Sequence, residues 1–323
     1  MSEISVTSFL LGSWQKNNIP GQQFKSPIDE SKLSNVTEHD IPSEEILKFS
    51  RNVGIKNLQK LNFHDRAKIL KSIGLLLNDA KEKLYSLSYH TGATLKDSYL
   101  DIDGGIGTLL VMASKARKEM DESFIHLDGD VEIISRKGTF LGQHIFSPLQ
   151  GVAVHINAFN FPVWGMLEKL SSSILAGVPT IVKPSASTSF LAQECMKIIS
   201  ESNLLPEGAL QFIPGRTNDL LDKLIGQDIV SFTGSSDTGF RIRSNPNLIK
   251  NSVKFISEQD SLNACIMGED VEIGDLEWDV FLKEVVNEIT SKAGQKCTAI
   301  RKIFVPENKL KETMEALKEN LES

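Results

Sequence analysis

The sequence predicts an α/β protein: a Rossmann-like parallel sheet with helices on both faces, an antiparallel β-hairpin arm, and the start of a second α/β domain. The first observation is that strand-length apolar runs alternate with helical patterns between residues 151 and 232, as in sheets built from parallel strands. The second is an alternation of apolar and polar residues between 124 and 150, around a turn at Lys137-Gly138, which is typical of a hairpin. Such sheets bind ligands beyond the C-terminal ends of their strands.

The composition limits the classes of function. The chain has 323 residues, of which 40% are hydrophobic and 24% are charged. This is enough apolar material for one large core or two moderate ones. The formal net charge is −7, and basic residues are scattered among acidic ones. Because phosphate neutralisation needs clustered Lys and Arg, this charge argues against a nucleic-acid partner.

The cysteines and the apolar runs indicate the compartment. Cys195, Cys265 and Cys297 are few, odd in number and widely spaced, so we expect neither a zinc site nor a disulfide framework. A reducing cytosol suits such a chain. The N-terminus shows no signal peptide pattern, and no apolar run approaches the ~18 residues that span a bilayer. We therefore expect a cytoplasmic protein with no metal and no membrane partner.

The elements before the hairpin are mostly helical. The first fifty residues are polar and show little periodicity, so they predict an arm wrapped over a domain rather than a core element. From Phe63, apolar residues recur at the spacing of an amphipathic helix, and further helices are expected over Ala80–His90 and Leu109–Met120. The details of Thr91–Gly107 stay open. That stretch is interrupted by Asp101, Asp103, Gly104 and Gly105.

After the hairpin, strands and helices alternate. Strands are expected at Gly151–Ile156, Thr180–Val182, Leu210–Phe212 and Ile229–Phe232. Helices between them are expected at Phe161–Leu175, Ser189–Glu201 and Asp219–Leu224. The later elements are a strand at Val253–Ile256, a helix at Trp278–Ala293, a strand at Arg301–Val305 and a charged helix at Lys309–Ser323.

The first motif, Asn157–Pro162, follows the first strand of the sheet. Asn160 lies between two aromatic residues and precedes a proline at the expected start of a helix. Its side-chain amide can donate a hydrogen bond to a developing oxyanion. The alternative is that Asn160 caps the helix that begins near Phe161.

Two further motifs suit phosphate or ribose. Lys183 comes directly after a buried strand and is followed by Pro184, so its ammonium lies at the C-terminal edge of the sheet. The alternative is an ordinary surface lysine. Residues 232–239 place glycines beside hydroxyl residues between a strand and a helix, and such loops offer backbone N–H groups to a phosphate. The loop matches neither a Walker motif nor the full GxGxxG fingerprint, and many ordinary turns contain similar residues.

The last two candidates are Glu258 and Cys297. Glu258 stands at the end of a strand, and Cys297 follows a helix. A deprotonated cysteine attacks carbonyl carbon well, and a nearby carboxylate can accept the thiol proton or activate water. A lone cysteine is more often a small core residue, and Cys195 and Cys265 are interpreted in that way.

Taken in order, five segments resemble the aldehyde dehydrogenase superfamily. They are NAFNFP (Asn157–Pro162), VKPS (Val182–Ser185), FTGSSDTG (Phe232–Gly239), SEQDSLN (Ser257–Asn263) and GQKCTA (Gly294–Ala299). The resemblance extends from Phe9 to Val305. The first and fourth segments look most like the aldehyde dehydrogenase domain of the bifunctional oxepin-CoA hydrolase and semialdehyde dehydrogenase of phenylacetate degradation.

The resemblance implies a reaction, in which an aldehyde, in that branch a CoA-thioester semialdehyde, is oxidised to an acid. Cys297 would attack the aldehyde, and Asn160 with a backbone N–H near Cys297 would hold the oxyanion. Hydride transfer to nicotinamide would leave a thioester, and Glu258 would activate the water that releases the acid. Relatives that transfer the acyl group to CoA generally lack this base, so Glu258 favours hydrolysis.

The resemblance also implies the cofactor site. The expected cofactor-binding residues are Asn157, Lys183, Ser185, Ala186, Gly215, Phe232, Gly234 and Ser235. NAD-preferring relatives often carry a glutamate three residues after the lysine, where this chain has Ala186. Since a carboxylate there repels a 2′-phosphate, its absence favours NADP over NAD. Ser235 and the following amides would hold the pyrophosphate.

By the same resemblance, residues 1–128 and 148–258 would form the NAD(P)-binding domain. Residues 129–147 would be an oligomerisation hairpin, and residues 259–323 part of the catalytic domain. In the family that domain continues well beyond the cysteine motif, so the chain corresponds to a C-terminally truncated member. Full-length relatives are expected to be homo-oligomers.

Two other functions remain open. The chain can be a catalytically inactive NAD(P)-binding fragment, in which Lys183 and Ser235 bind the cofactor and Cys297 is idle. It can also be a hydrolase in which His155 serves Cys297 as the base. His155 lies inside an apolar strand, where a buried histidine with a satisfied hydrogen bond is the more common case.

Overall fold

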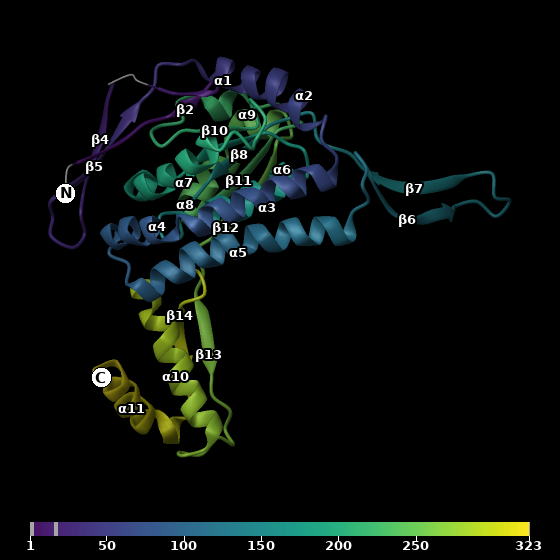
Figure 1. The fold of residues 1–323 in the computed structure, drawn as a ribbon. Helices are drawn as coiled ribbons and strands as arrows, with labels where there is room; N and C mark the ends of the chain where they lie inside the picture. The colour runs from purple at the N-terminus through teal and green to yellow at the C-terminus, as the bar shows by residue number, and fades with distance from the viewer. Residues whose placement is uncertain (1–2, 16–18, 323) are drawn as a thin grey trace. The chain divides into compact units, whose positions relative to one another are not determined.

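The computed structural model describes residues 3–15 and 19–322, and the chain divides into two compact units, Met1–Glu258 and Gln259–Ser323. Figure 1 traces the chain through both units. No helix among the described residues is long and apolar enough to cross a membrane. Each unit is described by itself.

A seven-stranded sheet organises the first unit. Its strand order is β12 (Lys254–Gln259), β11 (Ile229–Gly234), β8 (Ala153–Ile156), β9 (Thr180–Lys183), β10 (Leu210–Phe212), β2 (Phe9–Leu10) and β3 (Ser13–Trp14). The strands from β11 to β10 are parallel, and the register sets Val154 opposite both Ile181 and Val230. The predicted parallel sheet is therefore confirmed, and its strand ends lie at one edge.

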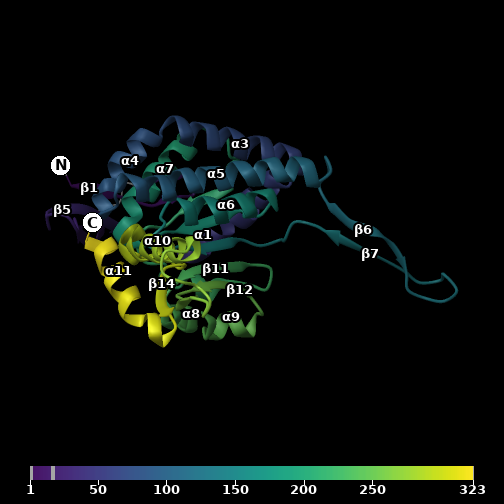
Figure 2. The same ribbon diagram turned by 90° about the horizontal axis from the view of Figure 1, so that it is seen from below.

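Helices cover both faces of this sheet, as Figures 1 and 2 show. One core contains residues of α3 (Phe63–Asp79), α5 (Leu95–Glu119), α6 (Trp164–Leu175) and α7 (Ser189–Glu201). The other contains residues of α1 (Ser43–Phe49), α8 (Ser236–Arg243) and α9 (Pro246–Lys250). Adjacent residues of β9 point to opposite faces, because Val182 is in the first core and Ile181 in the second. The element Asp219–Leu224 is only a short 3-10 turn, η4 (Leu220–Lys223).

Most of the stretch Thr91–Gly107, from Leu95 onward, belongs to a helix. A capping box between Thr94 and Asp97 starts α5, which runs for 25 residues through the aspartates and glycines. Gly104 and Gly105 lie against Trp164, where an added Cβ would come within 2.5 and 2.8 Å of its atoms. The glycines that interrupt the sequence pattern thus allow α5 to pack closely on α6.

The prediction that the N-terminal segment is only an arm outside the core is wrong in part. β4 (Ile19–Lys25) and β5 (Lys32–Glu38) do form a small outer sheet with β1 (Ile4–Val6). However, β2 pairs antiparallel with β10 and extends the main sheet. Leu10 and Val36 are buried, so this segment also supplies core residues.

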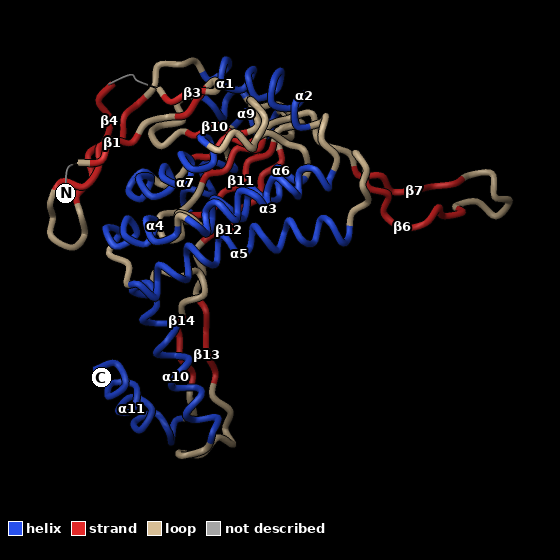
Figure 3. The backbone as a smooth tube through the Cα atoms, in the orientation of Figure 1, coloured by secondary structure: helices blue, strands red, loops and turns tan. Residues whose placement is uncertain are grey.

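The hairpin is present as predicted. β6 (His126–Ile133) and β7 (Leu141–Phe146) pair antiparallel from His126 with Phe146 to Ile133 with Leu141. Gly138 has a φ of 65° in the connecting turn. Figure 3 shows these two strands joined by loops to the rest of the first unit. The apolar side chains of the hairpin are exposed: Leu127, Val131, Ile133, Ile134, Phe140, Leu141, Ile145 and Phe146.

The second unit contains a two-stranded parallel sheet, β13 (Asn263–Ile266) with β14 (Ile300–Phe304), and two helices, α10 (Leu276–Thr290) and α11 (Leu310–Glu322). α10 ends at Thr290 rather than at Ala293. Lys292 and Ala293 have φ values of 51° and 53°, which a right-handed helix does not accommodate. The core of this unit is Met267, Trp278, Phe281, Leu282 and Val285.

Candidate active site

Several predicted residues lie at the C-terminal edge of the parallel strands. Asn157 directly follows β8, and its backbone amide donates to the carbonyl of Lys183, at 2.9 Å. Its side chain is 5% exposed, and neither Nδ2 nor Oδ1 has a hydrogen-bond partner among the described residues. Buried polar atoms without partners are rare, so this amide is suited to a ligand group.

A large cleft, here called the Lys183 cleft, is lined by Lys183, the last residue of β9. It has a volume of about 1040 Å³. It contains three of the predicted positions, Lys183, Ala186 and Gly215, and two further cations, Arg216 and Arg241. Among the described residues that line it, Glu38, from the end of β5, is the one carboxylate. The full lining is Pro20, Gly21, Gln22, Val36, Glu38, Lys183, Ala186, Gly215, Arg216, Thr217, Asn218 and Arg241.

Lys183 is half-buried in this cleft. Its ammonium donates to the carbonyl of Pro184 at 2.8 Å. Burial lowers the pKa of Lys183, and the charge of Glu38 opposes that shift. Glu38 itself accepts a hydrogen bond from the backbone amide of Arg216 at 2.9 Å. Lys183 is therefore placed by the end of β9 rather than being an ordinary surface lysine.

The loop after β11 has the form of a helix start. Phe232 is buried and its ring stacks on Phe255, with centroids 6.4 Å apart. Gly234 ends the strand, where an added Cβ would meet the Phe232 ring at 2.7 Å. Ser235 is exposed and is the N-cap of α8, where its hydroxyl accepts from the amide of Thr238. Beside Ala186, the half-buried Ser185 lies 3.2 Å from Ser187, hydroxyl to hydroxyl.

Asn160 precedes α6, and the structure bears on its alternative role as a cap. α6 begins at Trp164, not at Phe161. The amides of Val163 and Trp164 both donate to the carboxylate of Asp101, at 3.4 and 2.9 Å. A buried aspartate of α5 thus binds the first amides of this helix.

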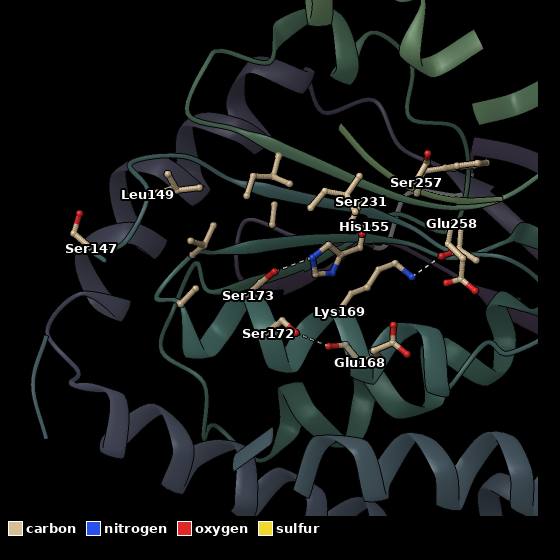
Figure 4. A pocket seen from close by; sticks show the side chains of 17 residues that line it. Ser147, Leu149, His155, Glu168, Lys169, Ser172, Ser173, Ser231, Ser257 and Glu258 are labelled. Atoms are coloured by element: carbon tan, nitrogen blue, oxygen red, sulfur yellow. Dashed lines mark hydrogen bonds between the residues drawn. The ribbon is translucent and has the colours of Figure 1, made fainter. Parts of the chain in front are cut away.

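A smaller cavity, the Lys169 pocket, lies against β8, β11, β12 and α6 and has a volume of about 420 Å³ (Figure 4). Lys169 of α6 points into it and donates to the hydroxyl of Thr233 at 2.8 Å. Burial lowers the pKa of Lys169, and the charges of Glu168 and Glu258 oppose the shift. Glu258, an exposed residue of β12, lines the same pocket. The carboxylate predicted as the base thus faces an amine, which the sequence did not indicate.

His155 also lines the Lys169 pocket and is 2% exposed. Its Nε2 lies 2.9 Å from the hydroxyl of Ser173. Burial, with a smaller effect of the Lys169 charge, lowers the pKa of His155 to about 3. A histidine that binds a proton so weakly is a poor general base, which argues against the hydrolase hypothesis.

The three cysteines differ in accessibility. Cys195 is fully buried in α7, and burial raises its pKa. Cys265 on β13 is half-buried, and burial raises its pKa too. Cys297, in the second unit, is exposed on the turn between α10 and β14. Of the three cysteines, Cys297 is therefore the most accessible to a reactant.

Side chains of the second unit fix the loop of Cys297. Glu288 of α10 binds the ammonium of Lys296 at 2.6 Å and the hydroxyl of Thr298 at 3.1 Å. The carbonyl of Cys297 accepts from Ser261 and, at 2.6 Å, from the amide of Asn263. The sequence motif contained Ser261 and Asn263, but nothing in it assigned them this contact.

Comparisons with known proteins agree with the fold and the motifs. The Aldehyde dehydrogenase family model matches residues 16–323. A 3,4-dehydroadipyl-CoA semialdehyde dehydrogenase of Aromatoleum evansii is 38% identical over 304 residues, which make up 94% of this chain and 59% of that protein. This confirms the resemblance on which the motifs were interpreted.

Solved structures show the same fold. Betaine aldehyde dehydrogenase from Staphylococcus aureus in complex with NAD+ matches with a TM-score of 0.83 at 22% identity, covering 99% of this chain and 61% of that one. NADP-dependent glyceraldehyde-3-phosphate dehydrogenase from Bacillus halodurans complexed with NADP matches with a TM-score of 0.82 at 20% identity, covering 99% and 65%. This chain thus spans about three fifths of the length of these relatives. It is a member of the aldehyde dehydrogenase family.

Proposed function

We propose that this chain carries the nicotinamide-cofactor site and the thiol nucleophile of an enzyme that oxidises an aldehyde to a carboxylic acid. The observation that carries the proposal is the state of the three cysteines: Cys297 is exposed in a loop fixed by neighbouring side chains, whereas Cys195 is buried and Cys265 is half-buried. The family membership and the strand-end cleft support the same conclusion.

The proposed reaction proceeds through covalent attachment. The Cys297 thiolate attacks the carbonyl carbon, and the oxygen becomes an oxyanion that the Asn160 amide stabilises. A nicotinamide cofactor held by the residues of the Lys183 cleft would supply the hydride acceptor for the same carbon, and the acyl group would then remain on Cys297 as a thioester. Glu258 takes a proton from water, the resulting hydroxide attacks the thioester, and the acid departs as the thiolate is regenerated.

The residues of the Lys183 cleft fit a dinucleotide. Lys183, Arg216 and Arg241 are cations suited to phosphate or ribose oxygens. The buried Asn157 amide, with its unpartnered atoms, adds a polar group close to β9. Gly215 lies so close to Glu38 that an added Cβ would come within 2.6 Å of the carboxylate, so a larger residue here would displace Glu38 in the cleft. Phe232, Gly234 and Ser235 form the neighbouring loop.

We propose NADP over NAD as the cofactor. Ala186 contributes no charge to the cleft, and among the described lining residues three cations outnumber the one carboxylate, Glu38. An added 2′-phosphate would be attracted by this excess of positive charge. Glu38 works against that preference, because its charge already acts on Lys183.

The proposed substrate is an aldehyde that carries a CoA thioester. It is supported by the 38% identity to the 3,4-dehydroadipyl-CoA semialdehyde dehydrogenase. We also propose that residues 129–147 join copies of the full-length protein. The support is the row of exposed apolar side chains on β6 and β7, because exposed apolar patches mark interaction sites.

The test is NADP and NAD reduction by the purified chain with a CoA-thioester semialdehyde. Cys297→Ala should abolish turnover, and Cys265→Ala, the matched thiol control, should retain it. Retained turnover in Cys297→Ala would overturn the role of this thiol. If the wild-type chain binds NADP, detected by tryptophan fluorescence, but does not reduce it, the result favours the alternative of a cofactor-binding fragment.

A further inference from the structure

The loop that presents Cys297 has an unfavourable backbone. Lys292, Ala293 and Gly294 form a consecutive run of left-handed residues with φ values of 51°, 53° and 71°. Only glycine adopts this conformation at little cost. Two non-glycine residues in it persist only when surrounding contacts hold them. The contacts of this loop therefore determine where the thiol lies.

Two side chains, Arg301 and Glu288, hold the loop on either side of Cys297. Arg301 of β14 donates to the carbonyl of Gly294. Glu288 of α10 holds Lys296 and Thr298, the two residues that flank Cys297. The Lys296–Glu288 pair is largely buried, with side-chain exposures of 14% and 21%. These contacts fix the peptide on each side of the cysteine but do not touch the cysteine itself.

The carbonyl of Cys297 is held by a separate pair, Ser261 and Asn263. Ser261 donates its hydroxyl to this oxygen, and Asn263 donates Nδ2 to it at 2.6 Å. Nδ2 also lies 3.0 Å from the Ser261 hydroxyl and 3.4 Å from the carbonyl of Ala299. Asn263 is the first residue of β13 and pairs with Ile300 of β14, so the sheet anchors this donor.

We propose that Ser261 and Asn263 are positioning residues for the nucleophile: by donating to the Cys297 carbonyl, they orient its peptide and favour the thiolate. This inference rests on the proposed role of Cys297. The carbonyl oxygen carries a partial negative charge on the same residue as the sulfur. Two donors directed at that oxygen place positive dipole ends nearby, and such dipoles favour the charged form of an adjacent acid.

The test measures thiol reactivity without cofactor or aldehyde. The intact chain is alkylated with iodoacetamide from about pH 5 to 10, where thiols titrate, and mass spectrometry follows the Cys297 and Cys265 peptides separately. Ser261→Ala and Asn263→Ala should each move the midpoint of the Cys297 profile to higher pH. The rate near neutral pH should fall about 3- to 10-fold, since one pH unit in the midpoint is tenfold in thiolate.

Four variants provide controls. Ser261→Thr keeps a hydroxyl and should restore the profile. Asn263→Asp keeps the shape but replaces the donor with an acceptor, so it should shift the midpoint further than alanine. Ser86→Ala and Asn320→Ala remove a hydroxyl and an amide that also donate to backbone carbonyls, but far along the chain, and should change nothing. If Cys265 on β13 is alkylated at the same rate in a variant as in wild type, the second unit remains folded.

Unchanged Cys297 profiles in both alanine variants would overturn the proposal. So would a shift in Ser261→Ala that threonine does not reverse, because it would indicate a packing effect. Failure of the wild-type chain to oxidise aldehyde would count against the proposed function alone. Alkylation needs neither substrate nor cofactor, so the two failures are distinguishable.

Discussion

The Lys183 cleft and the Lys169 pocket each place a half-buried lysine next to a strand of the same sheet, but they differ in charge and size. The cleft measures about 1040 Å³ and is lined by three cations with one carboxylate. The pocket measures about 420 Å³ and combines Lys169 with Glu168 and Glu258. Burial lowers the pKa of both lysines. Because the charged surroundings of the two lysines differ, we expect the Lys183 cleft to favour anions more than the Lys169 pocket does.

The largest expected effect separates the two lysines by ligand binding. Lys183→Met should weaken NADP binding by roughly 10- to 100-fold, since a hydrogen bond to a charged group contributes about 1.5–3 kcal/mol. Lys169→Met should leave NADP binding within a few-fold. Fluorescence titration measures both, with Lys71→Met, at an exposed site on α3, as the control. Equal losses in the two variants would remove the distinction between the cavities.

The second prediction concerns charge within the Lys183 cleft. Ala186→Glu should lower the ratio of NADP to NAD affinity about tenfold, because a second carboxylate repels the 2′-phosphate. Glu38→Gln should raise the same ratio by a smaller factor, since Glu38 also binds the Arg216 amide. Ala186→Gln adds bulk without charge and is the matched control. If it shifts the ratio as much as glutamate does, size rather than charge sets the preference.

The third prediction concerns His155 in the Lys169 pocket and the dependence of protein stability on pH. The pKa of His155 is lowered to about 3, so between that value and about 6.5 the unfolded chain binds a proton that the folded chain does not. Stability should therefore rise with pH across this window, by at most about 1.4 kcal/mol per unit. Urea unfolding of His155→Gln should lose this slope, and that of His144→Gln, at an exposed hairpin site, should keep it. Identical slopes in wild type and His155→Gln would contradict the assignment.

What the sequence predicted of the site follows from local order along the chain. Lys183 ends β9 and Ser235 directly follows β11, and strand ends in a parallel sheet meet at one edge. The same logic placed Asn157 and Glu258 at strand ends. The roles expected of these residues in cofactor binding and catalysis came from the resemblance to the aldehyde dehydrogenase family, not from the strand boundaries.

The rest depends on contacts between distant segments. Glu38 reaches the cleft from β5, and Lys169 reaches its pocket from the middle of α6. Asp101 looked like a helix breaker, yet its carboxylate binds the first amides of α6. The strand β2 was missed because only two residues pair there. No periodicity encodes such contacts, because each requires the fold to be known first.

The last prediction, which has the smallest expected effect, tests whether the charge of Glu258 raises the pKa of Lys169. The pKa of Lys169 is lower in the folded chain than in the unfolded chain. Between the lowered pKa and the unfolded value of about 10.5, the unfolded chain therefore binds more protons than the folded chain. The free energy of unfolding consequently rises with pH in this range. Lys169→Met removes this contribution, and its unfolding free energy should fall behind that of wild type as the pH increases from about 7 to 10. Parallel curves would show that the amine is not perturbed.

Glu258→Gln sharpens this result. The carboxylate of Glu258 favours the ammonium of Lys169 and opposes the effect of burial. Its removal should lower the pKa of Lys169 further, so the rise in stability should begin at a lower pH than in wild type. In the Lys169→Met background the same change should have no such effect. An equal shift in both backgrounds would show that Glu258 acts on another group, and the pairing of a base with an amine in this pocket would then be wrong.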